Sequence, residues 1–177
     1  QNTIDYRNDH GLGPSWLNSG IFWECHANFM RNLLYPQFVT AWGMDVYHYE
    51  AWGDWKNTYE NYALLMAILE SEGIEMVNRL WRESLGSEYP LQAYKRLAGY
   101  SQSQFNDSLY QYARRMATYD YNYKNLGQHF RQKRNADLNN WLPTIQNVYS
   151  ILRPVTGGVS GRYEIPIEQA PEEYAYN

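Results

Sequence analysis

Residues 20–34, GIFWECHANFMRNLL, form the stretch around which the rest of the chain is organised. Ser19 is a good helix N-cap, and Pro36 lacks the backbone N–H that would continue a helix. We therefore expect one helix from about residue 20 to residue 35. It contains a carboxylate (Glu24), the only cysteine of the chain and a histidine (His26) among large apolar residues.

A helical wheel at about 100° per residue divides this stretch into an apolar face and a polar face. The apolar face carries His26, whereas Glu24, Asn28, Arg31 and Asn32 fall on the opposite side. Glu24 and His26 diverge by about 200° around the helix axis, so they cannot both bind one metal ion in simple helical geometry.

Each of these side chains also has a structural interpretation. Glu24, Asn28 and Arg31 are spaced to form a solvated face with a helical ion pair. His26 is a buried histidine satisfied by one hydrogen bond, a ligand, or a general base, the last because its ordinary pKa lies near neutrality and suits proton transfer. Cys25 fits as a small apolar residue.

Apolar spacing further along the chain predicts a mainly α, multi-helix fold. Residues 62–69, YALLMAIL, are apolar at every position, which is typical of a helix covered on most sides. We expect further helices from Ile74 to before Gly86, from Pro90 to Ala98, from Ser101 to about Thr118, and over residues 125–138. The predicted organisation is a loop at residues 1–19, a helical domain at 20–144, and a β-prone segment at 145–177 that starts or leads into a following β domain.

Composition limits the function classes. The chain has 177 residues and a hydrophobic share of 44%, which suits one domain with a sizeable core. Its net charge of -4 argues against a nucleic-acid partner. The sequence has no run approaching the roughly 18 apolar residues of a membrane span. The stretch from Arg114 to Arg134 is rich in Lys and Arg and contains a single acidic residue, Asp120. Its cations form either a site for phosphate or an acidic polysaccharide, or a solvated helix face.

Complete catalytic motifs are absent from the sequence, including HExxH, a Walker loop and a G-x-S-x-G elbow. Asp45, His48 and Glu50 form a loose cluster of candidate metal ligands within an aromatic-rich connection. Motifs alone therefore assign no enzymatic reaction.

The segment GIFWECHANFM nevertheless resembles the third-ligand helix of gluzincin-type zinc metallopeptidases, in which a helix shortly after HExxH supplies a glutamate to the metal. It is most similar to a group of secreted HExxH proteins whose second helix reads FWE-S-HA-N-W-M, with Cys25 and Phe29 replacing the serine and the second tryptophan. Residues 60–84, residues 106–121 and APEEYAYN at the end of the chain resemble later segments of that group in the same order.

The resemblance implies that Glu24 is the third ligand of a zinc cofactor and that Asn28 or Arg31 orients its carboxylate. It places His26 beside the site as a candidate catalytic residue, and Asp120 as a structural acid near a helix end. It also implies a secreted or extracellular hydrolase acting on a peptide or glycoprotein. The HExxH ligands and catalytic glutamate have no counterparts here, so we expect this chain to be part of a larger protein and to be inactive by itself.

A second interpretation needs no metal. A helical binding or scaffold domain could use Trp42, Trp52, Trp55 and surface tyrosines to recognise a glycan or a protein, which would explain the aromatic share of 17%. A third is a pseudoenzyme that keeps the fold of a metallopeptidase without its chemistry.

Overall fold

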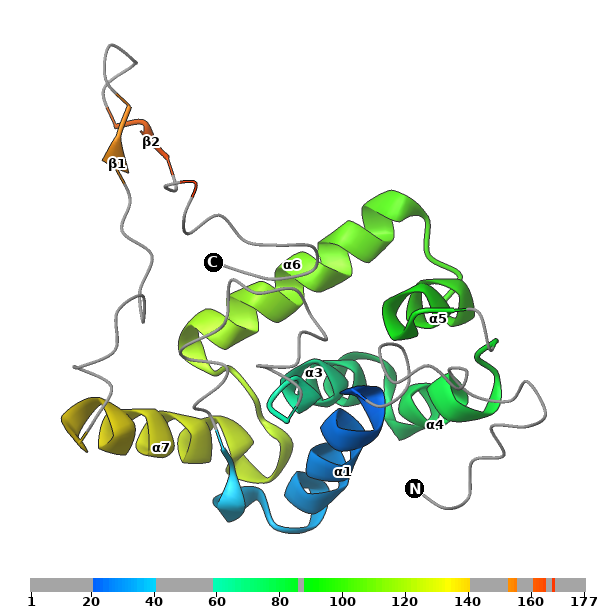
Figure 1. Cartoon of the computed structure of the whole chain (residues 1–177), viewed down its shortest axis with the longest axis horizontal. Helices are drawn as coiled ribbons and strands as arrows, with labels where there is room; N and C mark the ends of the chain where they lie inside the picture. The colour runs from blue at the N-terminus through cyan, green and yellow to red at the C-terminus, as the bar shows by residue number, and fades with distance from the viewer. Residues whose placement is uncertain are drawn as a thin grey trace.

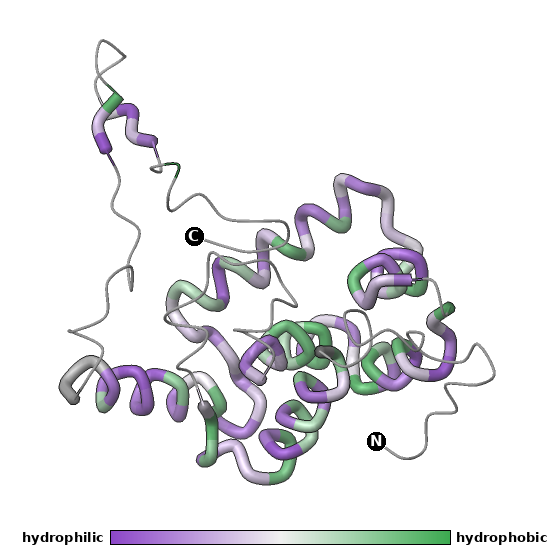
Figure 2. The backbone as a smooth tube through the Cα atoms, in the orientation of Figure 1, coloured by the Kyte–Doolittle hydropathy of each residue, from purple (hydrophilic) through white to green (hydrophobic). Residues whose placement is uncertain are grey.

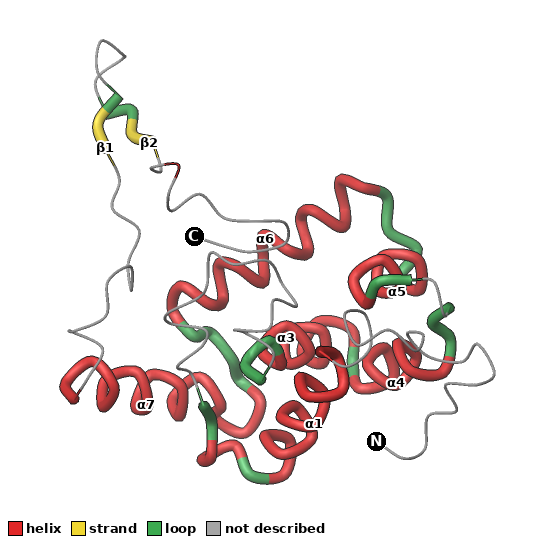
Figure 3. The backbone as a smooth tube through the Cα atoms, in the orientation of Figure 1, coloured by secondary structure: helices red, strands yellow, loops and turns green. Residues whose placement is uncertain are grey.

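The computed structural model describes residues 21–40, 59–85, 88–140, 153–155, 161–164 and 167. These residues form a mainly helical protein with a short two-stranded segment near the C-terminus, which confirms the predicted fold class (Figures 1 and 3). The helices are α1 (Ile21–Leu34), α3 (Tyr62–Glu72), α4 (Ile74–Arg82), α5 (Pro90–Leu97), α6 (Gln102–Thr118) and α7 (Leu126–Asn140), with 3-10 turns η2 (Pro36–Phe38) and η4 (Tyr123–Asn125).

Helix α3 lies at the centre of the core. Every side chain from Tyr62 to Ile68 is buried, as the continuous apolar stretch predicts. Figure 2 shows α3 as a largely hydrophobic segment, with α1, α4 and α6 around it. The helix ends at Gly73, which has a φ of 87° and donates its N–H to the carbonyl of Leu69 at 3.0 Å. Helix α4 begins at the next residue because this glycine turns the chain sharply.

Local sequence signals set the ends of α5 and α6. Pro90 begins α5, where a missing N–H has no cost, and Gly99 follows the helix with a φ of 69°. At the start of α6, the Ser101 hydroxyl accepts from the Gln104 N–H at 3.3 Å, and the Ser101 N–H donates to Gln104 Oε1 at 2.9 Å. This reciprocal capping box confirms the boundary that the sequence predicts.

The connection from α6 to α7 is fastened to α3 by polar contacts. Glu70 Oε1 accepts from the N–H groups of Asn122 and Tyr123 at 2.7 and 2.8 Å, and Glu70 Oε2 accepts from Arg115 Nη1 at 2.6 Å. The buried hydroxyl of Tyr121 donates to the carbonyl of Ala63 at 3.0 Å. These bonds join residues more than 40 positions apart and fix how α7 approaches the core.

The strands β1 (Arg153–Pro154) and β2 (Tyr163–Glu164) pair antiparallel, with Arg153 opposite Glu164, and all four residues are exposed. They lie within the segment that the sequence predicts to be β-prone. Among the helices that the structure describes, none is both long and apolar enough to cross a lipid bilayer.

Candidate functional site

Helix α1 turns a different face to the core from the one that the wheel suggests. Phe22, Cys25 and Phe29 are buried, as expected, but Asn32 is also completely buried instead of lying on a solvated polar face. Its amide nitrogen donates to the carbonyl of Asn28 at 2.8 Å, which satisfies one of its polar atoms. The assignment of Asn32 to the polar face is therefore wrong, because the buried face is rotated toward Cys25 and away from the exposed Met30.

Glu24 lies on one flank of this buried face. Its side chain is partly buried, and it has no hydrogen bond or ion pair within the described residues. Its helical neighbours are occupied elsewhere: Asn28 Nδ2 donates to the carbonyl of Tyr59 at 2.6 Å, and Arg31 Nη2 donates to Thr40 Oγ1 at 3.4 Å. Neither bond goes to Glu24, so the expectation that Asn28 or Arg31 orients its carboxylate stays a prediction.

Glu60 is a candidate residue that the sequence analysis did not find. Burial raises the pKa of its carboxyl group from 4.5 to about 7, although the positive charge of Arg31 acts in the opposite direction. Nearby, the hydroxyl of Tyr62 donates to the carbonyl of Thr40 at 2.9 Å. The only sequence signal for Glu60 is its place two residues before an uninterrupted apolar helix. A carboxyl group with a pKa near neutrality is suited to proton transfer.

Glu60 should make folding stability fall as the pH rises. Its pKa is higher in the folded chain than the unfolded value of 4.5, so the folded chain binds more protons between pH 4.5 and pH 7. The stabilising contribution is complete below pH 4.5 and is lost as the pH rises through about 7. We expect Glu60→Gln to remove this loss and to raise the free energy of unfolding at pH 8 by about 2 kcal/mol.

Urea unfolding at pH 5 and pH 8 measures this effect. Glu75→Gln is the matched control, because Glu75 is exposed and pairs with Arg82 at the surface. If the difference in stability between pH 5 and pH 8 is the same in Glu60→Gln as in the unchanged protein, Glu60 does not titrate in this range.

His26 lies on the other flank of α1, against aromatic rings. The centroid of its ring is 6.1 Å from that of Phe22, 5.5 Å from Phe29 and 5.2 Å from Trp81 of α4. Burial lowers the pKa of His26 to about 4, so its imidazole is neutral at pH 7. Its Nε2 atom is buried and has no hydrogen-bond partner in the described part of the chain. A catalytic role for His26 stays a prediction.

Cys25 is completely buried, and burial raises the pKa of its thiol well above the ordinary value. This agrees with its interpretation as a small apolar residue, because the reactive form of cysteine is the thiolate. Glu24, by contrast, offers a carboxylate without a partner among the described residues.

The described residues contain no group of three or more His, Cys, Asp or Glu side chains that could hold a metal ion. Glu24 can therefore be one ligand of a site, but the residues described around it do not complete that site. The alternative ligands Asp45, His48 and Glu50 and the alternative binding surface lie outside the described residues. That surface consists of Trp42, Trp52 and Trp55.

The basic residues between Arg114 and Arg134 contact the protein itself. Lys124 Nζ donates to the carbonyl of Leu33 at 2.7 Å, and Arg131 Nη1 donates to the carbonyl of Tyr119 at 2.9 Å. Lys133 pairs with Asp137 at 2.6 Å. Asp120 is exposed just beyond the end of α6. These contacts favour a structural role for the basic segment over an anion site.

Comparison with known proteins identifies one family. A family model described as "Family of unknown function (DUF6055)" matches residues 1–177. No curated protein and no solved structure matched the chain.

Proposed function

From the premise that this chain belongs to the DUF6055 family of unknown function, which its match over residues 1–177 shows, we propose that it forms the helical part of a zinc metallopeptidase-like domain. In this proposal Glu24 supplies one zinc ligand. The complete protein is a secreted hydrolase of peptide bonds, and the remaining ligands come from residues outside those described here.

The observation that carries the proposal is the state of the Glu24 carboxylate. It is partly buried, and no described residue donates a hydrogen bond to it or pairs with it. A carboxylate without a protein partner keeps its oxygens available to bind a cation. Glu24 forms no ion pair with a described residue, which is compatible with the role of a metal ligand.

The surface beside Glu24 also supports the proposal. Met30 and Leu34 are 45% and 64% exposed, and Ala27 lies exposed between them and the first turn of α1. These three residues follow one stripe of the helix, spaced three and four positions apart. An apolar stripe next to an unpaired carboxylate suits the docking of another helix that carries further ligands.

The chemistry divides between the metal and this chain. A bound zinc ion would act as a Lewis acid and lower the pKa of a bound water to about 7. Glu24 would contribute negative charge and one oxygen ligand. The carboxyl group of Glu60, whose pKa burial raises to about 7 and the charge of Arg31 lowers, would accept or supply a proton.

Zinc binding by the full-length gene product tests this proposal. We expect one zinc per chain by elemental analysis, and we expect Glu24→Gln to weaken zinc binding at least about 100-fold in a chelator competition, since it removes a direct ligand. Glu75→Gln, at the exposed surface of α4, is the matched control and should bind zinc as the unchanged protein does.

Two results would contradict the assignment of Glu24: a protein without zinc, and a Glu24→Gln variant with unaltered affinity. Peptidase activity is measured separately on the zinc-loaded protein. If zinc binding depends on Glu24 but no peptide is hydrolysed, the role of Glu24 as a ligand stands and the proposed hydrolase activity is excluded. The protein would then be a pseudoenzyme.

A further inference from the structure

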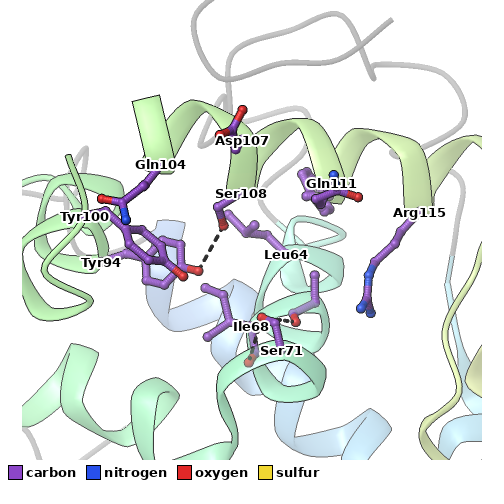
Figure 4. A pocket seen from close by; sticks show the side chains of 12 residues that line it. Leu64, Ile68, Ser71, Tyr94, Tyr100, Gln104, Asp107, Ser108, Gln111 and Arg115 are labelled. Atoms are coloured by element: carbon purple, nitrogen blue, oxygen red, sulfur yellow. Dashed lines mark hydrogen bonds between the residues drawn. The ribbon is translucent and has the colours of Figure 1, made fainter. Parts of the chain in front are cut away.

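A cleft lies between α3, α5 and α6 (Figure 4). Its volume is about 390 Å³, which falls within the roughly 300–1,000 Å³ of small-molecule sites. The floor comes from α3 and is mostly aliphatic, with Leu64, Ala67 and Ile68. These three side chains are at most 7% exposed, so they close the bottom of the cleft and leave its walls as the surface that would hold a ligand.

The walls of the cleft are rich in neutral groups that both donate and accept hydrogen bonds. Tyr94 and Tyr100 form one end, and Ser108 and Gln111 project from α6. Figure 4 shows the Tyr94 hydroxyl directed at the Ser108 hydroxyl, and their oxygens are 3.1 Å apart. Ser71, at the other side of the cleft, is exposed, and its hydroxyl donates a hydrogen bond to the carbonyl of Ala67 at 2.9 Å.

The hydrogen bonds at the tyrosine end run in one direction. The hydroxyls of Tyr94 and Tyr100 both donate to Glu72 Oε1, the second at 3.0 Å. Because Tyr94 gives its hydrogen to Glu72, the hydrogen of the Ser108 hydroxyl goes to Tyr94. The oxygen of Ser108 is thereby left as an acceptor beside the cleft.

Charges at the cleft disfavour an anionic ligand. Arg115 lines the opposite end, but Glu70 Oε2 pairs with it at 2.6 Å and offsets its charge. Asp107, on the rim, has no ion-pair partner among the described residues. Gln111 keeps its amide nitrogen free, because only its Oε1 is used, by Arg114 at 3.2 Å. The polar groups of the cleft that remain free to bind a ligand are therefore neutral donors and acceptors, together with the negative charge of Asp107.

We propose that this cleft binds a neutral saccharide, with its hydroxyls on Ser108, Gln111 and Asp107. Sugar hydroxyls each donate and accept, which matches hydroxyl and amide walls. This inference does not depend on zinc or on Glu24.

Binding of the bacterially expressed chain to a glycan array tests the proposal, with neutral, uronate-containing and sulfated glycans side by side. Hits are confirmed by calorimetry. We expect saturable binding of neutral glycans and weaker or no binding of the acidic ones. Gln111→Ala should weaken binding about fivefold, as expected for the loss of one hydrogen bond. Ser71→Trp, which places a large side chain at the rim, should abolish it.

Two matched controls keep these variants interpretable. Gln128→Ala changes an exposed glutamine on α7, and Ser103→Trp adds the same bulk to α6; neither residue lines the cleft. Both should bind like the unchanged chain, and Glu24→Gln or a chelator should also leave binding unchanged. The proposal is overturned by the absence of glycan binding, by a preference for acidic glycans, or by binding that survives both Gln111→Ala and Ser71→Trp.

Discussion

Gly127→Ala is expected to destabilise the protein by about 4 kcal/mol, the largest effect of any single methyl group that we predict. Gly127 is buried at the start of α7, and a Cβ atom there would lie 2.2 Å from the carbonyl oxygen of Tyr119 and 2.8 Å from that of Tyr121. Both are backbone atoms, so rotation of a side chain cannot relieve the clash. The cost therefore exceeds the roughly 1–3 kcal/mol of ordinary overpacking. Urea unfolding followed by circular dichroism measures it.

Gly99→Ala is the natural comparison, because it separates steric clash from backbone strain. Gly99 has a φ of 69°, but a Cβ atom there would meet nothing within 4 Å. The substitution should cost only about 1 kcal/mol, from the left-handed conformation alone. A Gly127→Ala variant that is no less stable than Gly99→Ala would contradict the close approach of α7 to the preceding turn.

The sequence predicts the fold where the signals are local. An unbroken apolar stretch identifies α3 as the central helix, and Gly73 ends it in the way that its sequence position indicates. Likewise, Ser101 and Gln104 place the start of α6. In each case the residues that form the signal also form the contact, within four positions of one another, so no knowledge of the tertiary structure is needed.

Periodicity alone does not determine which side of α1 faces the core. Apolar residues lie on more than one side of this helix, so the wheel has no unique buried face. Packing of α1 against α3 buries Asn32 and leaves Met30 and Leu34 exposed. The divergence of Glu24 and His26, by contrast, is a property of helical geometry, and the separate surroundings of the two side chains agree with it.

Glu60 illustrates what the sequence cannot supply for the candidate site. Burial raises the pKa of its carboxyl group, and the positive charge of Arg31, which is 29 positions earlier in the chain, partly opposes that rise. No spacing rule links two such residues, because only the packing of α1 against the start of α3 brings them together. The proposal that Glu24 is a zinc ligand likewise rests on resemblance, and only the structure adds that the residue is partly buried and has no partner among the described residues.

Glu70→Ala is expected to lower the free energy of unfolding by about 3 kcal/mol, because it leaves three donors without their shared acceptor. Its carboxylate, 11% exposed, binds Arg115 and the backbone N–H groups of Asn122 and Tyr123. The loss falls at the low end of the range for a broken buried ion pair, since Arg115 is 28% exposed and can be hydrated. Chemical unfolding, with m-values checked for two-state behaviour, gives the measurement.

Two further variants show which of these bonds matters. Glu70→Gln keeps one carbonyl oxygen for the N–H groups of Asn122 and Tyr123 but loses the charge, whereas Arg115→Ala removes the ion pair and leaves both N–H bonds. If the turn between α6 and α7 depends on the backbone bonds, both variants should be less destabilised than Glu70→Ala. Glu75→Ala, which breaks an exposed pair with Arg82, should show no measurable change. Equal stabilities of Glu70→Ala and Glu75→Ala would mean that Glu70 does not fasten this turn to α3.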